Sequence, residues 1–159
     1  MQTDKEIVLT ASGLKRIEQE LEHLVTVQRK RVADRIRDSK QFGEVTENAE
    51  YEDAKTEQAF VEGKIDELKR ILTHAHVIED DEVLTDCVCI GSIVKVRDLE
   101  TTDEWEYFIV GSVEANPAED KISNESPVGE ALMGRKIGEK VQVEIPAGMA
   151  RYEIVGIRK

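Results

Sequence analysis

Cysteine is scarce in this chain, which contains only Cys87 and Cys89. Their C-x-C spacing predicts that both side chains lie on one face of a strand, because alternate residues of a strand point the same way. A tetrahedral zinc site needs a second pair of ligands, and the sequence has no second cysteine pair. We therefore interpret the two cysteines as buried thiols rather than as metal ligands.

Long apolar runs are also missing. No run approaches the length of a membrane-spanning helix, and the polar start at residues 1–5 lacks the apolar segment of a signal peptide. We expect a soluble, cytoplasmic protein that makes no contact with a membrane.

Positive charge is in deficit, because 34 acidic side chains outnumber 22 Lys and Arg and give a formal net charge of −12. A protein that coats nucleic acid by bulk attraction needs clustered positive charge to release counterions. The composition excludes that class of protein. Any contact with nucleic acid must be local.

Helical periodicity is the main feature that the sequence does have. A chain of 159 residues, 35% of them charged, favours two modest units over one large core. Apolar residues recur at steps of three or four, or their sums, in a first stretch that Thr10 or Ser12 is placed to cap. That stretch contains Leu14, Ile17, Leu21, Val25, Val32 and Ile36. A second stretch alternates steps of four and three, which is typical of a coiled coil, through Ala54, Gln58, Val61, Ile65, Leu68 and Leu72.

The two stretches match each other as an antiparallel pair. If the chain reverses near Val45, the facing residues are Ile36/Ala54, Val32/Gln58, Gln28/Val61, Val25/Ile65, Leu21/Leu68, Ile17/Leu72 and Leu14/Ala75. The two residue numbers of every pair add up to 89 or 90, as an antiparallel hairpin requires. The sequence therefore predicts a long antiparallel coiled-coil hairpin.

After Leu72 the pattern changes to a period of two, which predicts strands. The expected strands are residues 92–97, 104–110, 140–145 and 151–155, and a short helix is expected over residues 127–133, capped by Ser126. The resulting domain division is a hairpin at residues 1–78, with an acidic turn at residues 43–51, an acidic linker and lead-in at 79–90, and an α+β domain at 91–159.

The turn of the hairpin is strongly acidic. Five acids and no base lie between Glu44 and Ala54: Glu44, Glu47, Glu50, Glu52 and Asp53. One interpretation is that these acids only solubilise the turn and favour the start of the second helix through its dipole, with Thr46 as the N-cap. The other is that they hold a metal ion, since carboxylates are hard oxygen ligands.

Six bases precede the turn, namely Arg29, Lys30, Arg31, Arg35, Arg37 and Lys40. They cannot all share one helical face, because neighbouring residues differ by about 100°. Since Asp34 and Asp38 lie among them, ordinary surface ion pairs are one interpretation. Contact with a nucleic-acid backbone near the turn is the alternative.

The whole chain resembles the Gre-type bacterial transcript cleavage factors, and most closely the A branch of that family. Residues 43–51, Gly-Glu-Val-Thr-Glu-Asn-Ala-Glu-Tyr, are similar to the family's tip signature Gly-Asp-x-x-Glu-Asn-x-x-Tyr. Residues 57–65 resemble its second-helix segment, and residues 110–111, 122–127 and 132–134 resemble its C-terminal domain. The resemblance implies a C-terminal domain with an FK506-binding-protein-like fold that docks on bacterial RNA polymerase. It also implies that the hairpin enters the secondary channel of the polymerase.

The resemblance assigns the chemistry to the turn. Glu44 and Glu47 are expected to hold a second Mg²⁺ or its water in the polymerase active centre, with Asn48 and Tyr51 shaping the turn around them. The polymerase itself then cuts backtracked RNA, and this chain is an accessory factor, not an enzyme. Glu44 stands where cleavage-active members usually have Asp, and the extra methylene shifts the carboxylate.

Other residues receive roles by the same resemblance. Near the turn, Arg37, Lys40 and Lys55 are expected to contact the 3′ end of the nascent RNA. In the C-terminal domain, the expected polymerase-docking residues are Ile122, Ser123, Ser126 and Pro127. The chain is expected to bind no cofactor when alone and to act as a monomer.

Three alternatives remain open at this point. A related factor could occupy the same channel and inhibit without cleavage, which the Glu at position 44 permits. A coiled-coil adaptor would bind another protein and leave the polymerase unaffected. Peptidyl-prolyl isomerase activity is disfavoured because that pocket needs several aromatic side chains, and aromatic residues make up only 4% of the chain.

Overall fold

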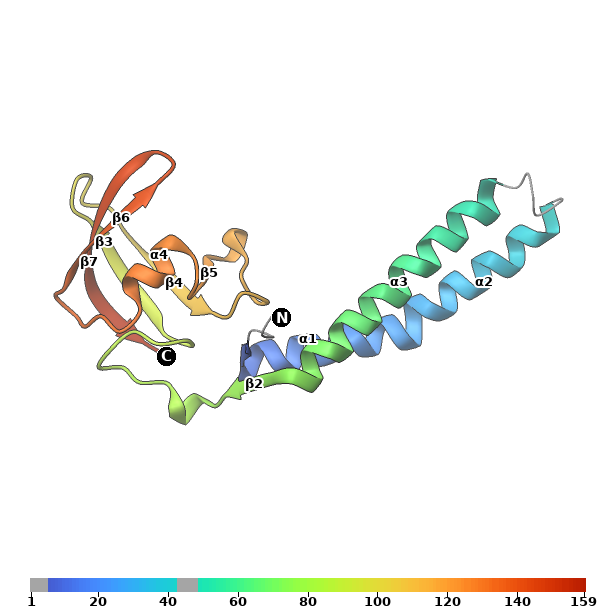
Figure 1. Ribbon diagram of the computed structural model, residues 1–159, viewed down its shortest axis with the longest axis horizontal. Helices are drawn as coiled ribbons and strands as arrows, with labels where there is room; N and C mark the ends of the chain where they lie inside the picture. Colours follow the sequence, from blue (N-terminus) through green and yellow to red (C-terminus); the bar gives the residue numbers. More distant parts are fainter. Residues whose placement is uncertain (1–5, 43–48) are drawn as a thin grey trace, which may run out of the picture. The chain divides into compact units, whose positions relative to one another are not determined.

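A computed structural model describes residues 6–42 and 49–159 of the chain (Figure 1). The chain folds into two compact units. The hairpin unit is Leu14–His74, and the globular unit combines the residues up to Gly13 with Ala75–Lys159. The chain thus leaves the globular unit, forms the hairpin and returns.

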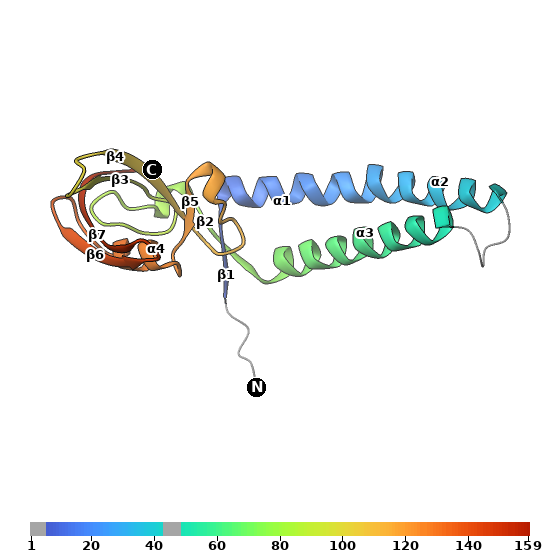
Figure 2. The same cartoon turned by 90° about the horizontal axis from the view of Figure 1, so that it is seen from above.

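The hairpin unit consists of two helical arms that lie side by side in both ribbon views (Figures 1 and 2). The elements of the first arm are α1 (Ala11–His23), a π-helix η1 (Leu24–Gln28), α2 (Arg29–Ser39) and a 3-10 turn η2 (Lys40–Phe42). The second arm is the single helix α3 (Ala49–His74). Thr10 caps α1 as expected, because its Oγ1 accepts a hydrogen bond from the N–H of Gly13 at 3.1 Å.

The apolar stripe of α3 packs on the first arm and forms the seam between the two arms. Val32, Val61 and Ile65 are buried together, with Leu21, Leu24, Val25 and Ile36 packed against them. This confirms the predicted hairpin, and burial of such side chains is the main source of its stability. The seam differs near its base, where Ile71 is buried and Leu72 only half-buried.

Two features of the hairpin differ from the sequence pattern. The pattern predicted one uninterrupted α-helix through Leu24–Gln28, where the structure has a π-helix instead. A π turn carries one extra residue and rotates the helix beyond it. Ala75, which the pattern placed in the seam opposite Leu14, is the first residue of strand β2 (Ala75–Ile78) and pairs with Ile7.

The globular unit contains two sheets. In the first, β1 (Ile7–Thr10) pairs in parallel with β2. The second sheet has five strands in the order β5-β4-β3-β7-β6. Its strands are β3 (Ile93–Asp98), β4 (Glu104–Val110), β5 (Lys121–Ser123), β6 (Lys140–Ile145) and β7 (Gly148–Arg158). The short helix α4 (Pro127–Leu132) and two 3-10 turns, η4 (Asp80–Glu82) and η5 (Pro117–Glu119), complete the unit.

The core of the globular unit lies on one face of the five-stranded sheet. Fully buried side chains include Val94 and Val96 of β3, Ile154 of β7 and Leu132 of α4. Leu132 joins this cluster because α4 packs against β5 and β6. Beside the core, the Trp105 ring meets Tyr107 and Tyr152 edge to face, with ring centroids 6.0 and 5.5 Å apart.

Most predicted strands agree with the structure, and residues 104–110 and 140–145 agree at both ends. The expected helix at residues 127–133 forms over Pro127–Leu132, and Ser126 caps it by accepting a hydrogen bond from the N–H of Gly129. The sequence pattern assigns all of residues 1–78 to the hairpin, whereas β1 and β2 belong to the globular unit. Their backbone pairing places them there.

The prediction that Cys87 and Cys89 share a strand face was wrong. Residues 87–89 form a bend and an irregular segment, and both cysteines are half-buried. The N–H of Val88 donates to the carbonyl of Arg135 at 2.8 Å, and the N–H of Cys89 donates to Ser92 Oγ at 3.0 Å. Backbone groups used in these contacts do not enter a strand ladder.

Among the helices of residues 6–42 and 49–159, none combines the length and the apolar character that a membrane span needs.

Candidate functional site at the end of the hairpin

The acidic turn joins the end of the first arm to the start of the second. Glu44, Glu47 and Asn48 lie outside the described residues. Tyr51, the remaining predicted residue of the turn, lies half-buried in the first turn of α3. The described structure therefore fixes the two helix ends from which the acidic turn extends.

The start of α3 is itself acidic. Glu50 and Glu52 lie in its first turn, and both are exposed. Carboxylates at a helix N-terminus complement the positive end of the helix dipole. The interpretation of these two acids as helix-stabilising charges is thus consistent with their position.

The two arms remain packed together up to the turn. Ser39, the last residue of α2, is 3% exposed, and Ala54 of α3 is fully buried. The Ser39 hydroxyl donates to the carbonyl of Ile36 at 2.7 Å, which satisfies this buried polar group. Small residues at the end of the seam allow the helices to stay in contact where the larger apolar side chains have ended.

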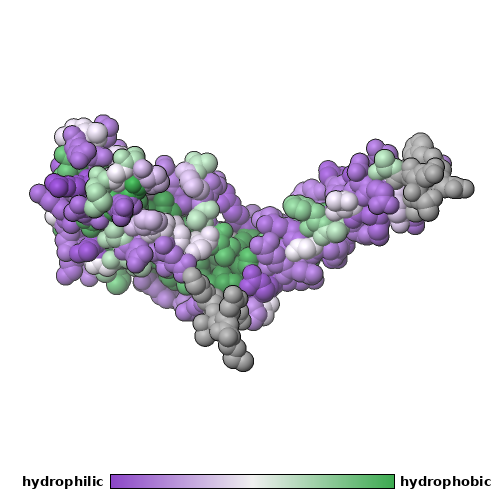
Figure 3. Space-filling model, turned by 45° about the horizontal axis from the view of Figure 1, so that its top comes forward, coloured by the Kyte–Doolittle hydropathy of each residue, from purple (hydrophilic) through white to green (hydrophobic). Residues whose placement is uncertain are grey.

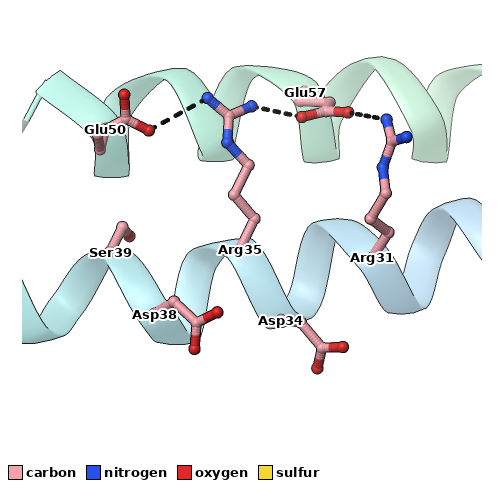
Figure 4. Close-up of a pocket in the computed structure, with 7 residues that line it drawn as sticks. All are labelled: Arg31, Asp34, Arg35, Asp38, Ser39, Glu50 and Glu57. Atoms are coloured by element: carbon pink, nitrogen blue, oxygen red, sulfur yellow. Dashed lines mark hydrogen bonds and ion pairs between the residues drawn. The ribbon is translucent and has the colours of Figure 1, made fainter.

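A ladder of ion pairs joins α2 to α3 along this end of the hairpin (Figure 4). Arg35 donates to Glu57 Oε2 at 2.5 Å and to Glu50 Oε2 at 3.4 Å. Arg31 donates to the other oxygen of Glu57 at 3.1 Å. Further from the turn, Arg29 makes two hydrogen bonds to Glu62, at 2.8 and 2.9 Å.

The ladder borders an open groove of about 790 Å³. Its lining residues are Arg31, Asp34, Arg35, Asp38, Ser39, Glu50 and Glu57. In Figure 4 the two arginine side chains reach across from one helix to the glutamates of the other, and Asp34 and Asp38 point away from them. The groove thus has mixed charge and no excess of bases.

These contacts change the acidity of the groups involved. The hydrogen bond from Arg35, and then that from Arg31, holds the pKa of Glu57 below its usual range. The hydrogen bond to Glu57 likewise raises the pKa of Arg35. Three of the bases before the turn form ion pairs with residues of α3, namely Arg29, Arg31 and Arg35.

The three predicted RNA-contacting residues lie close to the turn. Arg37 is near Asp34, at 3.2 Å, and near Asp38, at 3.7 Å. Lys55 Nζ donates to Gln58 Oε1 at 3.0 Å. Lys40 is exposed in η2. For Arg37 the structure supports the interpretation as a surface ion pair, and such pairs are weak enough to exchange partners.

The partners of Arg35 differ from those that the sequence suggested. Asp34 and Asp38 on the same helix were the expected partners, whereas Glu50 and Glu57 come from the opposite one. The coiled-coil pattern could have predicted these partners, because residues that flank a coiled-coil seam often carry opposite charges and pair between the two helices.

The predicted docking residues gather at one corner of the globular unit, where β5 leads into α4. Ser126 Oγ donates to the carbonyl of Ser123 at 2.6 Å, and Ser123 Oγ accepts a hydrogen bond from the N–H of Glu125 at 3.0 Å. Ile122 is half-buried against the core, and Pro127 is exposed. The structure therefore brings Ile122, Ser123, Ser126 and Pro127 together in one ordered corner.

Close packing and hydrogen bonds hold this corner together. A Cβ atom added at Gly129 would lie 1.9 Å from the carbonyl oxygen of Ser123, so α4 approaches β5 as closely as only glycine permits. Ser112 Oγ adds contacts to Ser123 Oγ and to Glu125 Oε2, each at 3.0 Å. A preformed surface loses little conformational entropy on binding.

Within the described residues, no three His, Cys, Asp or Glu side chains are grouped so as to hold a metal ion. The donor set of Glu44 and Glu47 consists of carboxylate oxygens, which are ligands that Mg²⁺ prefers.

Comparison with known proteins identifies a family match for each of the two units. A model described as "Transcription elongation factor, N-terminal" matches residues 7–77, and one described as "Transcription elongation factor, GreA/GreB, C-term" matches residues 83–159. The chain is 54% identical over 159 residues to transcription elongation factor GreA of Acetivibrio thermocellus, covering all of both chains. It is equally similar to GreA of Alkaliphilus oremlandii, again over the full length of both.

Among solved structures, GreA factor homolog 1 (Gfh1) of Thermus thermophilus is similar, with 27% identity and a TM-score of 0.45. The match covers 98% of this chain and 100% of that one.

Proposed function

From the premise that the chain belongs to the GreA/GreB family of transcription elongation factors, we propose that it acts on bacterial RNA polymerase through its acidic turn. In this proposal it stimulates cleavage of backtracked RNA by the polymerase. The observation that carries the proposal is the 54% identity over the whole chain to proteins named transcription elongation factor GreA. The polymerase supplies the active site, and the chain is an accessory factor.

The two units have separate roles in this proposal. The globular unit, as an FK506-binding-protein-like domain, docks on the polymerase through the corner formed by Ile122, Ser123, Ser126 and Pro127. The hydrogen bonds of that corner support this role, because they order its side chains in the absence of any partner. One copy of the chain binds each polymerase, in the cytoplasm.

The hairpin is the part that enters the polymerase, through its secondary channel. An apolar seam supports α3 along most of its length, so the hairpin can hold the turn at a fixed reach. Buried Ser39 and Ala54 extend the packing to the last turn of α2 and to the second turn of α3. Correct positioning of a catalytic group can lower the activation free energy of a reaction substantially. A turn held by packed helices would provide such positioning.

Glu44 and Glu47 are the residues that would hold an Mg²⁺ ion shared with the polymerase. When bound, that ion lowers the pKa of the attacking water and stabilises charge on the phosphate. The two carboxylates would bind the ion and orient it, while Asn48 and Tyr51 maintain the conformation of the turn.

Near the turn, Arg37, Lys40 and Lys55 are proposed to contact phosphates of the RNA 3′ end. Arg37 can leave its aspartate partners at a small cost in free energy, because exposed ion pairs contribute little to stability. The pairing of Arg29, Arg31 and Arg35 with α3 keeps the basic patch small.

The test uses purified polymerase complexes that have backtracked on a DNA template, with Mg²⁺ present. We expect the wild-type chain to shorten the RNA and restore elongation, and Glu47→Ala to abolish both effects while retaining binding to polymerase. The matched control is Glu52→Ala, which removes the same charge from the first turn of α3 and is expected to leave cleavage intact.

Two results would contradict the proposal. Cleavage by Glu47→Ala at the wild-type rate would remove the acidic turn from the mechanism. A wild-type chain that blocks elongation without cleavage would identify an inhibitory factor.

A further inference from the structure

Strand β6 forms one edge of the five-stranded sheet. Among the described strands only β7 lies beside it, and the pairing of these two ribbons can be followed in Figure 1. The register between them is unbroken from Lys140 to Ile145, so the edge is regular and carries no bulge. A regular edge strand presents backbone N–H and C=O groups that a further strand can use.

The hydrogen bonds of β7 indicate which backbone groups of β6 face outward. The carbonyl of Arg151 in β7 accepts a hydrogen bond from the N–H of Leu99, which follows β3, so Arg151 directs its backbone groups away from β6. Opposite residues of an antiparallel pair either bond to each other or both point away. Gln142 lies opposite Arg151 and therefore points outward. Since direction alternates along a strand, Lys140 and Glu144 also point outward.

The side chains of these three residues carry a symmetric charge pattern. Lys140, Gln142 and Glu144 are exposed, and the residues between them are buried. The two charged residues stand about 13 Å apart along the strand, too far to pair with each other. Glu153, opposite Lys140 on β7, pairs with Arg97 instead. Within residues 6–42 and 49–159, Lys140 and Glu144 thus have no ion-pair partner.

We propose that β6 pairs with β6 of a second copy of this chain, antiparallel and about a two-fold axis at Gln142. Lys140 of each copy then lies opposite Glu144 of the other, and Gln142 faces its own counterpart. All of these pairs join residues whose backbone groups face outward, so the two strands can exchange the hydrogen bonds of an antiparallel ladder. The proposal does not depend on the function proposed above.

The charges select this register over its neighbours. A pair centred on Lys140 places two lysines opposite each other, and one centred on Glu144 places two glutamates opposite each other. Like charges that face each other across strands destabilise the pairing. A pair centred on Val141 or Val143 leaves both charged residues without an opposite charge across from them. Self-complementarity at Gln142 is the reason for assigning this edge to a second copy.

Backbone hydrogen bonds and charge carry this contact, rather than burial of a large apolar area. The visible surface of the globular unit is mostly hydrophilic, with small apolar patches (Figure 3). Because one strand pair makes a small interface, we expect a weak and reversible dimer. The corner proposed to dock on polymerase includes β5, which lies at the opposite edge of the sheet, so the contact does not use its residues.

Sedimentation velocity of the full chain over a range of concentrations tests the contact. The wild type is expected to form dimers at micromolar to submillimolar concentration. Lys140→Glu and Glu144→Lys are each expected to weaken dimerisation about tenfold, because each places like charges in both symmetry-related pairs. The control is Lys15→Glu, at an exposed position of α1, which changes the net charge as Lys140→Glu does and is expected to dimerise normally.

A mixture of the two charge variants tests the register itself. When Lys140→Glu meets Glu144→Lys, opposite charges face each other again in both pairs, so dimers are expected to return to about the wild-type amount. Gln142→Pro removes an outward N–H that the sheet does not use, which an edge strand tolerates, and is expected to abolish the dimers. Fluorescence of Trp105 checks that each variant remains folded.

Several results would overturn the inference. They are a wild-type chain that stays monomeric at the highest concentration, dimers that persist unchanged in Lys140→Glu, an equal loss in Lys15→Glu, or a mixture that remains monomeric. Oligomers larger than a dimer would overturn it as well, because a contact between two identical strands about a two-fold axis is closed.

Discussion

Glu114 binds Thr10 at two points with one carboxylate. Its Oε2 accepts a hydrogen bond from the N–H of Thr10 at 2.8 Å, and its Oε1 accepts one from the hydroxyl at 2.7 Å. The same hydroxyl caps α1 through the N–H of Gly13. A residue between β4 and η5 thus holds both the end of β1 and the start of the first helix.

Removing this carboxylate should weaken the globular unit. We expect Glu114→Ala to lower its free energy of unfolding by about 1–3 kcal/mol, because hydrogen bonds to a charged group are lost and a partly buried N–H is left unpaired. Trp105 is the only tryptophan and lies in β4, so its fluorescence in a urea titration reports this unit. Glu144→Ala, at an exposed position, is the control, and an equal loss there would contradict the role of Glu114.

Gly111 is expected to tolerate no side chain. An added Cβ would lie 2.2 Å from the carbonyl oxygen of Val8, so β1 or the end of β4 has to move. We expect Gly111→Ala to cost about 1–3 kcal/mol of unfolding free energy in the same fluorescence assay. Val113→Ala, two residues away and exposed, should stay close to wild type. Wild-type stability of Gly111→Ala would show that β1 is free to shift.

The hairpin seam should be sensitive to truncation at Ile65, which is fully buried. Ile65→Ala is expected to destabilise the hairpin by about 2–5 kcal/mol, through lost burial and the cavity left behind. Circular dichroism at the helical band measures this unit, because most described helix lies in it. An exposed position such as Val27 should accept alanine with little effect, and similar melting of the two variants would refute the assigned seam.

The ion pair of Arg35 and Glu57 should make hairpin stability depend on pH. Because the folded pKa of Glu57 is lowered, the pair contributes its full stability above the ordinary carboxyl range, about 4.3. That contribution is lost as the pH falls through the lowered value. Glu57→Gln should therefore melt earlier than wild type at neutral pH, and the difference should shrink in acid and in high salt. A difference that grows in acid would contradict the assignment.

A substitution at position 44 tests for a gain of RNA cleavage rather than for a loss. Glu44→Asp restores the residue that cleavage-active relatives usually carry, and an error of about 1 Å in a catalytic group can cost ~10²-fold in rate. We expect Glu44→Asp to raise the rate of stimulated RNA cleavage without changing polymerase affinity. The measurement is single-turnover cleavage at saturating factor. A lower rate would show that the turn is built around the longer side chain.

The parts of the fold that the sequence predicted depend on local periodicity. Val61, Ile65 and Leu68 repeat along α3 at heptad spacing, and a pattern over neighbouring turns is enough to identify a seam. The strand at residues 140–145 alternates buried and exposed side chains in the same local way. Ser126 followed by proline marked the start of α4 correctly.

The features that the sequence did not predict depend on distant or alternative contacts. β1 and β2 are four residues each and lie on opposite sides of the hairpin in sequence, so neither has enough pattern to reveal the pairing. The π-helix follows from backbone geometry that apolar spacing does not encode. The partners of Arg35 depend on helix phase and rotamer. Glu44 and Glu47 were predicted as site residues from the family signature alone, and that prediction still needs its test.

The pairing of β1 with β2 has a consequence for how such a chain diversifies. Because β1 and β2 are parallel, Leu14–His74 follows the end of β1 and precedes the start of β2, so it is inserted between two paired strands of the globular unit. A segment inserted in this way behaves as a cassette, which recombination can exchange while the pairing of the two strands is kept. Adding or deleting matched heptads in both arms would alter the length of the hairpin alone, and one globular unit could therefore carry hairpins of different lengths.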